Sequence, residues 1–417
     1  ANNPNISEAV QLILVQDSKD SVRKNLAKNP NISENIQLTL TQDSSENVKF
    51  TLALSNPNIS ENIQLFFAQS EDEYARRNLA KNSKINEKVQ RILANDSVEE
   101  VKENLAENSN LIEEIQLSFA ESGSEWIKYN LASNINIKKA VQSKLVQDND
   151  YWVKIYLYQN SNVDKDIHLA AMNDTDASNY ILSCDNNIVD NAKLLTLSES
   201  DDVYVLRNLA KNPNINEKII MKLSKVEDNR TKINLASNPS LNETIQNYFL
   251  QQNDDIRKSL AGNHCIIESI QLKLTQDNDD WVRIALAENP NITEIAQLKL
   301  SQDADDWVRR ALYSNLNISE NVQLKCSQYD RGFLDDQDVI DMGIMSGRNK
   351  LAENPNITEK VQLEILTDSS TYVREHLAKN PNITEKVQFK LAQDKDEVRE
   401  ALFQNPNLSV RVEQLLS

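Results

Sequence analysis

The sequence predicts an all-α fold, an α-solenoid in which about sixteen two-helix repeats of about 26 residues follow one another. Three observations predict it. A motif of the form Val-Arg-x-x-Leu-Ala-x-Asn-Pro-Asn-Ile returns at regular spacing, apolar residues inside each copy recur every three or four positions, and all nine prolines occupy one slot of the motif. The Asn-x-Asn step begins at Asn3, Asn29, Asn56, Asn108, Asn134, Asn160, Asn212, Asn289, Asn315, Asn354, Asn380 and Asn405, with looser copies at Asn82, Asp185, Asn238 and Asn263.

The turn of each repeat is the step Asn29-Pro30-Asn31 in the copy that we take as an example. Asn tolerates the left-handed conformation that ends many helices, and proline cannot continue a helix, so we expect Asn29 to follow a helix end. Asn31 and Glu34 have the spacing of a capping box, which predicts that Asn31 is the N-cap of the next helix.

Two short helices are expected after this turn, a first over residues 32–41 and a second over residues 44–54. Asp43 and Glu46 have the spacing of a second capping box at the start of the second helix. Helices of about ten residues are marginally stable alone, so burial between repeats must supply most of the stability. The residues expected to face inward are Ile36, Leu40, Val48 and Leu52.

The composition excludes several classes of protein. With 63 acidic and 45 basic residues the net charge is −18, which argues against a broad basic surface for nucleic acid. The three cysteines are isolated, which disfavours a disulfide framework, a zinc site or an iron–sulfur site. No stretch approaches the roughly 18 apolar residues of a membrane helix, so we expect no membrane insertion and a cytoplasmic, bacterial protein.

A basic residue follows the inward apolar residue of most second helices, and an Asp often precedes it by six positions, as in Asp277 and Arg283. Stacked repeats would place these acids and bases in a charge ladder whose members neutralise one another. The alternative is a basic stripe that binds a ligand. The basic positions are Arg23, Lys49, Lys102, Lys128, Lys154, Arg257, Arg283, Arg309, Arg374 and Arg399.

The motif from Asp277 to Pro290 resembles the leucine-rich repeat variant family, and its Asp…Val-Arg core is similar to HEAT repeats. The resemblance covers nearly the whole chain. It implies a right-handed superhelix of paired helices, with one of the pair a 3₁₀ segment in some members, and it implies a protein scaffold, although a few relatives bind or repair DNA. The iron–sulfur domain of some members has no counterpart in these cysteines.

We therefore expect a single repeat domain over residues 1–417, and its irregular parts are where function is sought. Residues 1–80, 208–325 and 346–417 repeat regularly, residues 81–207 are degenerate and aromatic, and half a repeat is inserted at about 329–345. All four tryptophans directly precede an inward Val or Ile and so are expected to be partly exposed. The candidate binding surface comprises Trp126, Tyr129, Tyr151, Trp152, Tyr156, Tyr158, Trp281, Trp307, Tyr329 and Phe333, with Tyr180 as a further aromatic of the degenerate part.

Catalytic signatures are weak in this sequence. The three histidines lie in different repeat positions, and five glycines cannot form a phosphate-binding loop. The insertion holds Asp335, Asp336, Asp338 and Asp341, but their spacing does not match a calcium loop, and an extra helix or a protruding loop is the favoured interpretation.

We predict a non-catalytic scaffold, without cofactor or metal, that binds another macromolecule along an extended surface. A protein is the favoured partner, and the aromatic residues of the candidate surface are its expected contacts. The alternative is a nucleic-acid-binding solenoid that uses the basic ladder. A third interpretation is an acidic mimic of DNA that acts as an inhibitor.

Overall fold

In the computed structural model, which describes residues 3–329 and 347–416, every regular element is an α-helix. Helices that follow one another in the chain pack side by side, which confirms the predicted α-solenoid. The chain divides into two compact units, Ala1–Ile181 and Leu182–Ser417. The expected single domain over residues 1–417 stays a prediction.

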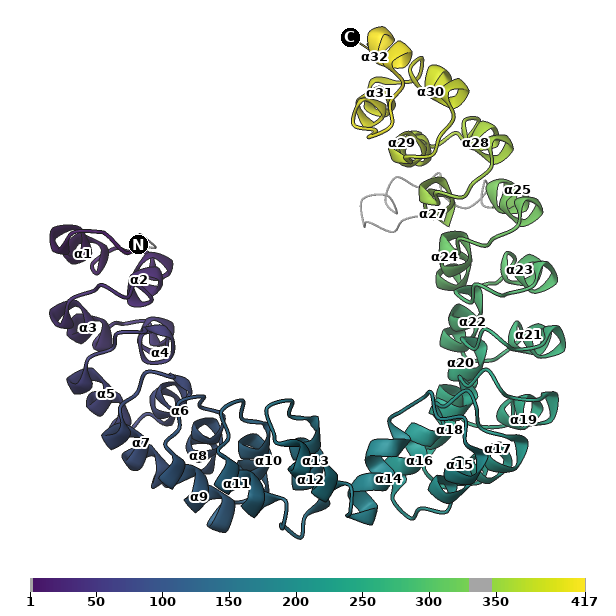
Figure 1. Ribbon diagram of the computed structural model, residues 1–417. Coiled ribbons are helices and arrows are strands. Elements are labelled where there is room, and N and C mark those ends of the chain that lie inside the picture. The colour runs from purple at the N-terminus through teal and green to yellow at the C-terminus, as the bar shows by residue number, and fades with distance from the viewer. Residues whose placement is uncertain (1–2, 330–346, 417) are drawn as a thin grey trace. The chain divides into compact units, whose positions relative to one another are not determined.

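Two rows of helices make up each unit (Figure 1). The A helices follow the Asn-rich turns, and the B helices follow the short acidic loops. In the first unit the A helices are α1 (Glu8–Leu14), α3 (Glu34–Thr41), α5 (Glu61–Ala68), α7 (Glu87–Ala94), α9 (Glu113–Ser122), α11 (Lys139–Leu145) and α13 (Lys165–Ala171). Its B helices are α2 (Asp20–Ala27), α4 (Glu46–Ser55), α6 (Glu73–Lys81), α8 (Glu99–Ala106), α10 (Glu125–Ser133), α12 (Tyr151–Gln159) and α14 (Thr175–Ser183), the last of which contains the division.

The second unit continues the same alternation. Its A helices are α15 (Asn191–Ser198), α17 (Glu217–Ser224), α19 (Glu243–Phe249), α21 (Glu268–Leu274), α23 (Glu294–Leu300), α25 (Glu320–Tyr329), α28 (Glu359–Ile365), α30 (Glu385–Leu391) and α32 (Val410–Leu416). Its B helices are α16 (Val203–Leu209), α18 (Asn229–Ala236), α20 (Asp254–Ala261), α22 (Asp280–Ala287), α24 (Asp306–Ser314), α27 (Gly347–Glu353), α29 (Thr371–Lys379) and α31 (Asp396–Phe403).

The core lies between the two rows. Leu286 and Ala287 at the end of helix α22 are fully buried, as are the corresponding Leu and Ala of most other B helices. Successive B helices pack more closely than successive A helices do. Each unit taken alone therefore curves toward its B row, and the exposed side of the B helices is its inner surface.

The helix starts differ from the sequence prediction. Helix α3 begins at Glu34 with Ser33 as its N-cap, so the prediction that Asn31 caps this helix is wrong. The Ser33 hydroxyl accepts a hydrogen bond from Ile36 N–H, while the Asn31 amide donates to Pro4 of the preceding turn. The N-cap of helix α4 is likewise Ser45 rather than Asp43. The error has one cause: local spacing cannot distinguish a cap from a bond to a neighbouring repeat.

Where the first Asn of the turn is the C-cap of a B helix, its backbone is extended and not left-handed, as at Asn56, Asn82, Asn134, Asn160, Asn315 and Asn380. At Asn56, which ends helix α4, the backbone is extended, with φ −76° and ψ 119°. Its amide Nδ2 donates to the carbonyls of Ala27 and Asn29 in the preceding repeat, at 2.8 and 3.1 Å, and its Oδ1 accepts from Asn58 N–H at 2.9 Å. These bonds pair carbonyls that the end of a helix leaves without partners. The residue is an Asn because only an amide both donates and accepts in this way.

A second series of amides joins the A helices. Gln37 donates through Nε2 to Ile32 of its own repeat and to Asn58 of the next, while its Oε1 accepts from Ser60 N–H at 2.8 Å. The corresponding buried residues are Gln11, Gln64, Gln90, Gln116, Gln142, Gln246, Gln271, Gln297, Gln323, Gln362 and Gln388. Each repeat is thus fixed to its neighbour by polar bonds as well as by apolar packing, and a buried amide with all its bonds satisfied stabilises this arrangement.

Both series change where the two units divide. His168, Leu194 and Ile220 occupy successive positions of the Gln series, and Asp185 occupies the position of the first Asn. Asp185 is exposed and accepts from Asn187 N–H, but a carboxylate has no N–H with which to donate to a carbonyl. The degenerate repeats that the sequence indicated therefore coincide with the division at Ile181 and Leu182.

The predicted insertion at about 329–345 falls almost wholly on residues 330–346, outside the described residues. Around it the stacking is preserved. Asn354 donates to the carbonyls of Tyr313 and Asn315 at 2.8 and 2.9 Å, although 39 residues separate Asn354 from Asn315. The repeats on either side of the insertion are therefore direct neighbours.

Candidate protein-binding surface on the B helices

The four tryptophans lie in the first turn of their B helices, each next to a buried apolar residue. Trp126, Trp281 and Trp307 are 63, 60 and 67% exposed, as the rotation of about 100° per residue predicts, while Trp152 is half-buried. Large aromatic side chains that remain this exposed are unusual, and they are enriched in binding surfaces.

In the first unit, tyrosines surround two of these tryptophans. The rings of Trp126 and Tyr129 meet edge to face with centroids 5.5 Å apart, and Tyr129 contacts Tyr156 of the next B helix at 5.2 Å. Trp152 lies between Tyr151 and Tyr180, at 5.4 and 4.8 Å. Aromatic residues that the sequence separates by a whole repeat are therefore brought together on helices α10, α12 and α14.

Tyr129 is further held by a hydrogen bond that its hydroxyl donates to the Asp150 carboxylate. Burial and this hydrogen bond raise the pKa of Tyr129 well above the ordinary range of tyrosine. The phenol is therefore neutral and fixed in place at physiological pH. Tyr158, the remaining candidate of this region, is 38% exposed and contacts His168, with ring centroids 5.6 Å apart.

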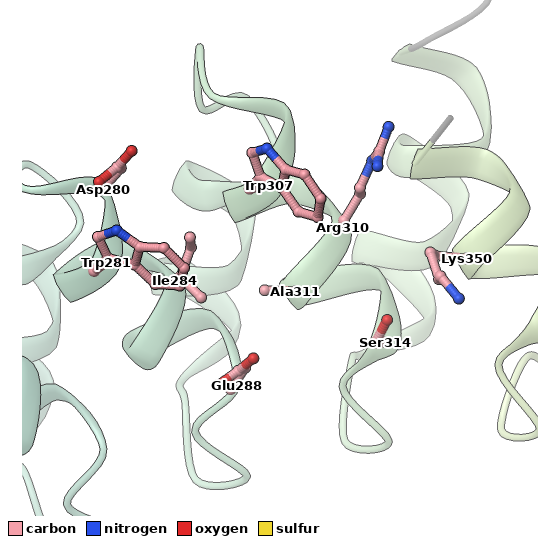
Figure 2. A pocket seen from close by; sticks show the side chains of 9 residues that line it. All are labelled: Asp280, Trp281, Ile284, Glu288, Trp307, Arg310, Ala311, Ser314 and Lys350. Atoms are coloured by element: carbon pink, nitrogen blue, oxygen red, sulfur yellow. The ribbon is translucent and has the colours of Figure 1, made fainter. Parts of the chain in front are cut away.

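The second unit has an open pocket beside Trp281 and Trp307, which lie on the successive B helices α22 and α24. It encloses about 750 Å³ and is lined by helices α22, α24 and α27. The indoles of Trp281 and Trp307 extend along the surface in the same sense, and the Ile284 and Ala311 side chains lie between the two helices (Figure 2). The remaining lining residues are Asp280, Glu288, Arg310, Ser314 and Lys350.

Cations lie against both indoles. The Lys258 Nζ is 5.0 Å from the centre of the Trp281 ring, and the Arg310 guanidinium carbon is 5.0 Å from that of Trp307. At these distances each cation is attracted by the negative face of the ring. The combination of exposed indoles, an apolar floor and charged borders is typical of a site that binds an amphipathic group.

The sequence singled out Trp281 and Trp307 but missed Ile284, Ala311, Arg310 and Glu288. A signal was present in the sequence. The third position after the first Trp of each pair is Tyr129 or Ile284, and the fourth position after the second Trp is Tyr156 or Ala311. The two other predicted contacts are not tested. Phe333 lies outside the described residues, and the structure describes Tyr329 only as the last residue of helix α25.

The basic ladder is used internally. The guanidinium Nε of Arg23 lies 2.7 Å from Asp43 of the next repeat, and the same bidentate arrangement joins Arg283 to Asp303. Within the described chain, equivalent cross-repeat ion pairs are Arg76–Asp96, Lys128–Asp148, Lys154–Asp174, Arg207–Asp228, Arg257–Asp277, Arg348–Asp368 and Arg374–Asp394. Arg309 pairs with Asp306 of its own helix at 3.1 Å.

These cross-repeat pairs leave the arginines that form them largely covered. The side chains of Arg23, Arg283 and Arg374 are only 11, 16 and 10% exposed. The hydrogen bond from Arg374 lowers the pKa of Asp394 below its usual range, and burial opposes this only in part. At Asp277 burial alone would raise the pKa, but the hydrogen bonds from Arg257 and from Asp279 N–H outweigh it, so the pKa is again lowered. The carboxylates are therefore ionised and paired at neutral pH.

No group of three or more His, Cys, Asp or Glu side chains that could hold a metal ion occurs in residues 3–329 and 347–416. The aspartates of the insertion, Asp335, Asp336, Asp338 and Asp341, lie outside these ranges. Among the described helices, none is both long and apolar enough to span a membrane.

Comparisons with known proteins add little. No family model and no curated protein matches the chain. Among solved structures, the chain is similar to an engineered protein in a crystal structure, at 11% identity over 85% of this chain and 97% of the engineered one, with a TM-score of 0.10. A superposition this loose informs neither the fold nor the function.

Proposed function

We propose that the protein is a non-catalytic scaffold that binds another protein on the exposed side of its B helices, with the pocket of the second unit as the principal contact. The observation that carries this proposal is the pair of indoles, Trp281 and Trp307, which are 60 and 67% exposed around an apolar pocket. Aromatic side chains that are exposed in the free protein and become buried in the complex supply much of the affinity in protein interfaces.

The charge distribution favours a protein over a nucleic acid. A phosphate backbone needs an exposed basic surface, but the ladder arginines such as Arg283 are directed into ion pairs with aspartates. The net charge of −18 would repel a polyanion further. An acidic mimic of DNA would not require exposed indoles. Membership of the leucine-rich repeat variant or HEAT-like families, and a cytoplasmic location, stay predictions from the sequence.

Affinity capture from a lysate of the native source, with chemical crosslinking and mass spectrometry, tests the proposal. The full chain should retain a specific protein, and the double variant Trp281→Ala/Trp307→Ala should lose it. The matched control is Ile295→Ala/Met221→Ala, which removes exposed apolar side chains from the A helices α23 and α17. Equal recovery with all three proteins would contradict a role for the B-helix surface.

The nucleic-acid alternative has its own measurement. Labelled single- and double-stranded oligonucleotides are titrated with the chain at about 50 and about 200 mM salt, because a phosphate-driven complex loses roughly a thousandfold or more in affinity over that interval. We expect no binding at either concentration. Tight, salt-dependent binding that disappears on Arg283→Glu would replace the proposed function.

A further inference from the structure

The charged side chains around the Trp281–Trp307 pocket are not equally neutralised by the chain itself. The two cations that line the pocket are already paired: Arg310 Nε lies 2.5 Å from Asp306, and Lys350 Nζ lies 2.8 Å from Glu353. The two acids that line the pocket, Asp280 and Glu288, form no ion pair within the described part of the chain. Lys258, beside the Trp281 ring, likewise has no ion pair in the described part of the chain, so the unpaired groups here are two carboxylates and one ammonium, and their sum is negative.

We infer that this pocket binds a lysine or arginine side chain from a basic segment of the partner protein, with the cation at Glu288 and its aliphatic stem between the two indoles. The inference rests on the proposed function and specifies the chemistry of the partner. It concerns only residues of helices α22, α24 and α27.

The apolar floor suits the stem of such a side chain. Lysine and arginine cover apolar surfaces with their methylene groups while the charged end stays near water or a counter-ion. Ile284 and Ala311 provide the surface, and the two indoles form its sides (Figure 2). Glu288 is exposed at the end of the same helix that carries Trp281 and Ile284, so one helix offers both the stem surface and the counter-ion.

The indoles themselves are suited to cations. Lys258 and Arg310 of this chain already lie 5.0 Å from the ring centres of Trp281 and Trp307. Tryptophan is the aromatic side chain that attracts cations most strongly. Because these two cations already lie against the rings, the indoles would contact the methylene groups of the incoming side chain, and its charged end would be neutralised by Glu288.

An acidic segment is the less favourable occupant. It would compete with Asp306 and Glu353 for cations that are already paired, and it would meet the unpaired carboxylate of Glu288. A purely apolar segment would cover Asp280 and Glu288 without supplying a counter-ion, which is unfavourable for a carboxylate. The net charge of −18 also accelerates the approach of a basic partner.

The test is a selection of random twelve-residue peptides displayed on phage against the immobilised full chain, followed by affinity measurements on the enriched peptides by fluorescence polarisation. The enriched sequences should contain lysine or arginine. Their affinity should fall by about tenfold or more on Trp281→Ala/Trp307→Ala, and by about tenfold on Glu288→Lys. The matched control, Glu268→Lys on helix α21, makes the same change in net charge at an exposed site outside the pocket and should alter affinity less than about twofold.

The outcomes separate this inference from the proposed function. Enriched peptides that are acidic or apolar but still depend on the two tryptophans would overturn the inference and leave the proposed function standing. Basic peptides that bind the tryptophan and Glu288 variants as tightly as the native chain would reveal general attraction to an acidic protein, and would also overturn it. Enriched peptides that bind the double tryptophan variant as tightly as the native chain would overturn the inference. The proposed function would fail as well only if the protein captured from lysate also binds without the tryptophans.

Discussion

Trp126 and Trp152 in the first unit occupy the same repeat position as Trp281 and Trp307 in the second, yet their surroundings differ. Tyr129 and Tyr156 follow the first pair, with ring centroids 5.2 Å apart, and fill the space between neighbouring B helices. The equivalent residues after the second pair are Ile284 and Ala311, and a pocket of about 750 Å³ remains. The first region fills the space between its B helices with tyrosine rings, whereas the second leaves that space open beside its tryptophans.

The polar framework beneath the two regions is the same. Asn134 donates to the carbonyls of Ala106 and Asn108 at 2.8 and 2.9 Å. Asn289 donates to the equivalent carbonyls at the same two distances. Stacking is therefore independent of the exposed positions of the B helices, and those positions can differ between repeats without disturbing the solenoid.

The largest expected effect comes from breaking this shared framework. Asn289→Asp and Asn134→Asp each leave two buried carbonyls without a donor and place a carboxylate beside them, so each should lower the free energy of unfolding by about 3 kcal/mol or more. The urea midpoint of the circular dichroism signal should fall to a similar extent in both variants, because the two sites make the same bonds.

The controls for these variants are Asn291→Asp and Asn136→Asp. Their native amides are exposed and each donates to one carbonyl, of His264 and Ser109 respectively. They should cost less than about 1 kcal/mol. Equal destabilisation by buried and exposed substitutions would show that the buried Asn series does not hold the repeats together.

A smaller effect should follow from exchanging the two surfaces. Ala311→Tyr with Ile284→Tyr should fill the pocket as Tyr156 and Tyr129 fill the first region. Affinity for the captured partner should fall about tenfold or more, while the urea midpoint changes little, because these positions are partly exposed. Unchanged affinity would mean that the partner binds elsewhere.

The reverse exchange, Tyr129→Ile with Tyr156→Ala, should open the first region. It removes a ring contact and the hydrogen bond to Asp150, so we expect a loss of roughly 1–3 kcal/mol in stability. Acrylamide quenching of Trp126, whose ring contacts Tyr129, should increase. Quenching that stays constant would contradict the view that Tyr129 covers part of the Trp126 indole.

The smallest effects concern the ion pairs, and they set the response to acid. The pKa values of Asp277 and Asp394 are lowered in the folded chain. The stability they contribute is therefore fully present above the unfolded pKa of about 3.9, and it is lost as the pH falls below that value. Because solvent partly screens each ion pair, a single pair contributes less than about 1 kcal/mol to the free energy of unfolding.

The urea midpoint should accordingly stay constant between about pH 7 and pH 5 and fall below about pH 4. In the variant Arg374→Met with Asp394→Asn, the fall should be shallower because one pair is absent. A midpoint that rises on acidification would show that these pairs do not stabilise the folded state.

The sequence predicted the architecture because the repeat is encoded locally. Apolar spacing located the helices, and the position of each Trp beside a buried residue predicted the exposure of Trp126, Trp281 and Trp307. The caps were assigned wrongly at Asn31 because its amide bonds to Pro4, in another repeat, and local spacing contains no information on such contacts.

The pocket was not predictable for a related reason. The pocket exists because Ala311 on helix α24 is too small to fill the space beside Trp281 on helix α22. Its charge depends on the pairing of Arg310 and Lys350 with nearby acids. Each of these residues is ordinary within its own repeat. Only their juxtaposition distinguishes this region from the one around Tyr156.

The most direct test of the account is acrylamide quenching of four variants, each of which retains one tryptophan and has phenylalanine at the other three positions. Without ligand, Trp281 and Trp307 should be quenched more than Trp152, which is half-buried. Addition of the selected peptide or captured partner should protect Trp281 and Trp307 and leave Trp126 and Trp152 unchanged. Protection of the first pair instead, or of none, would contradict the claim that the second unit carries the binding surface.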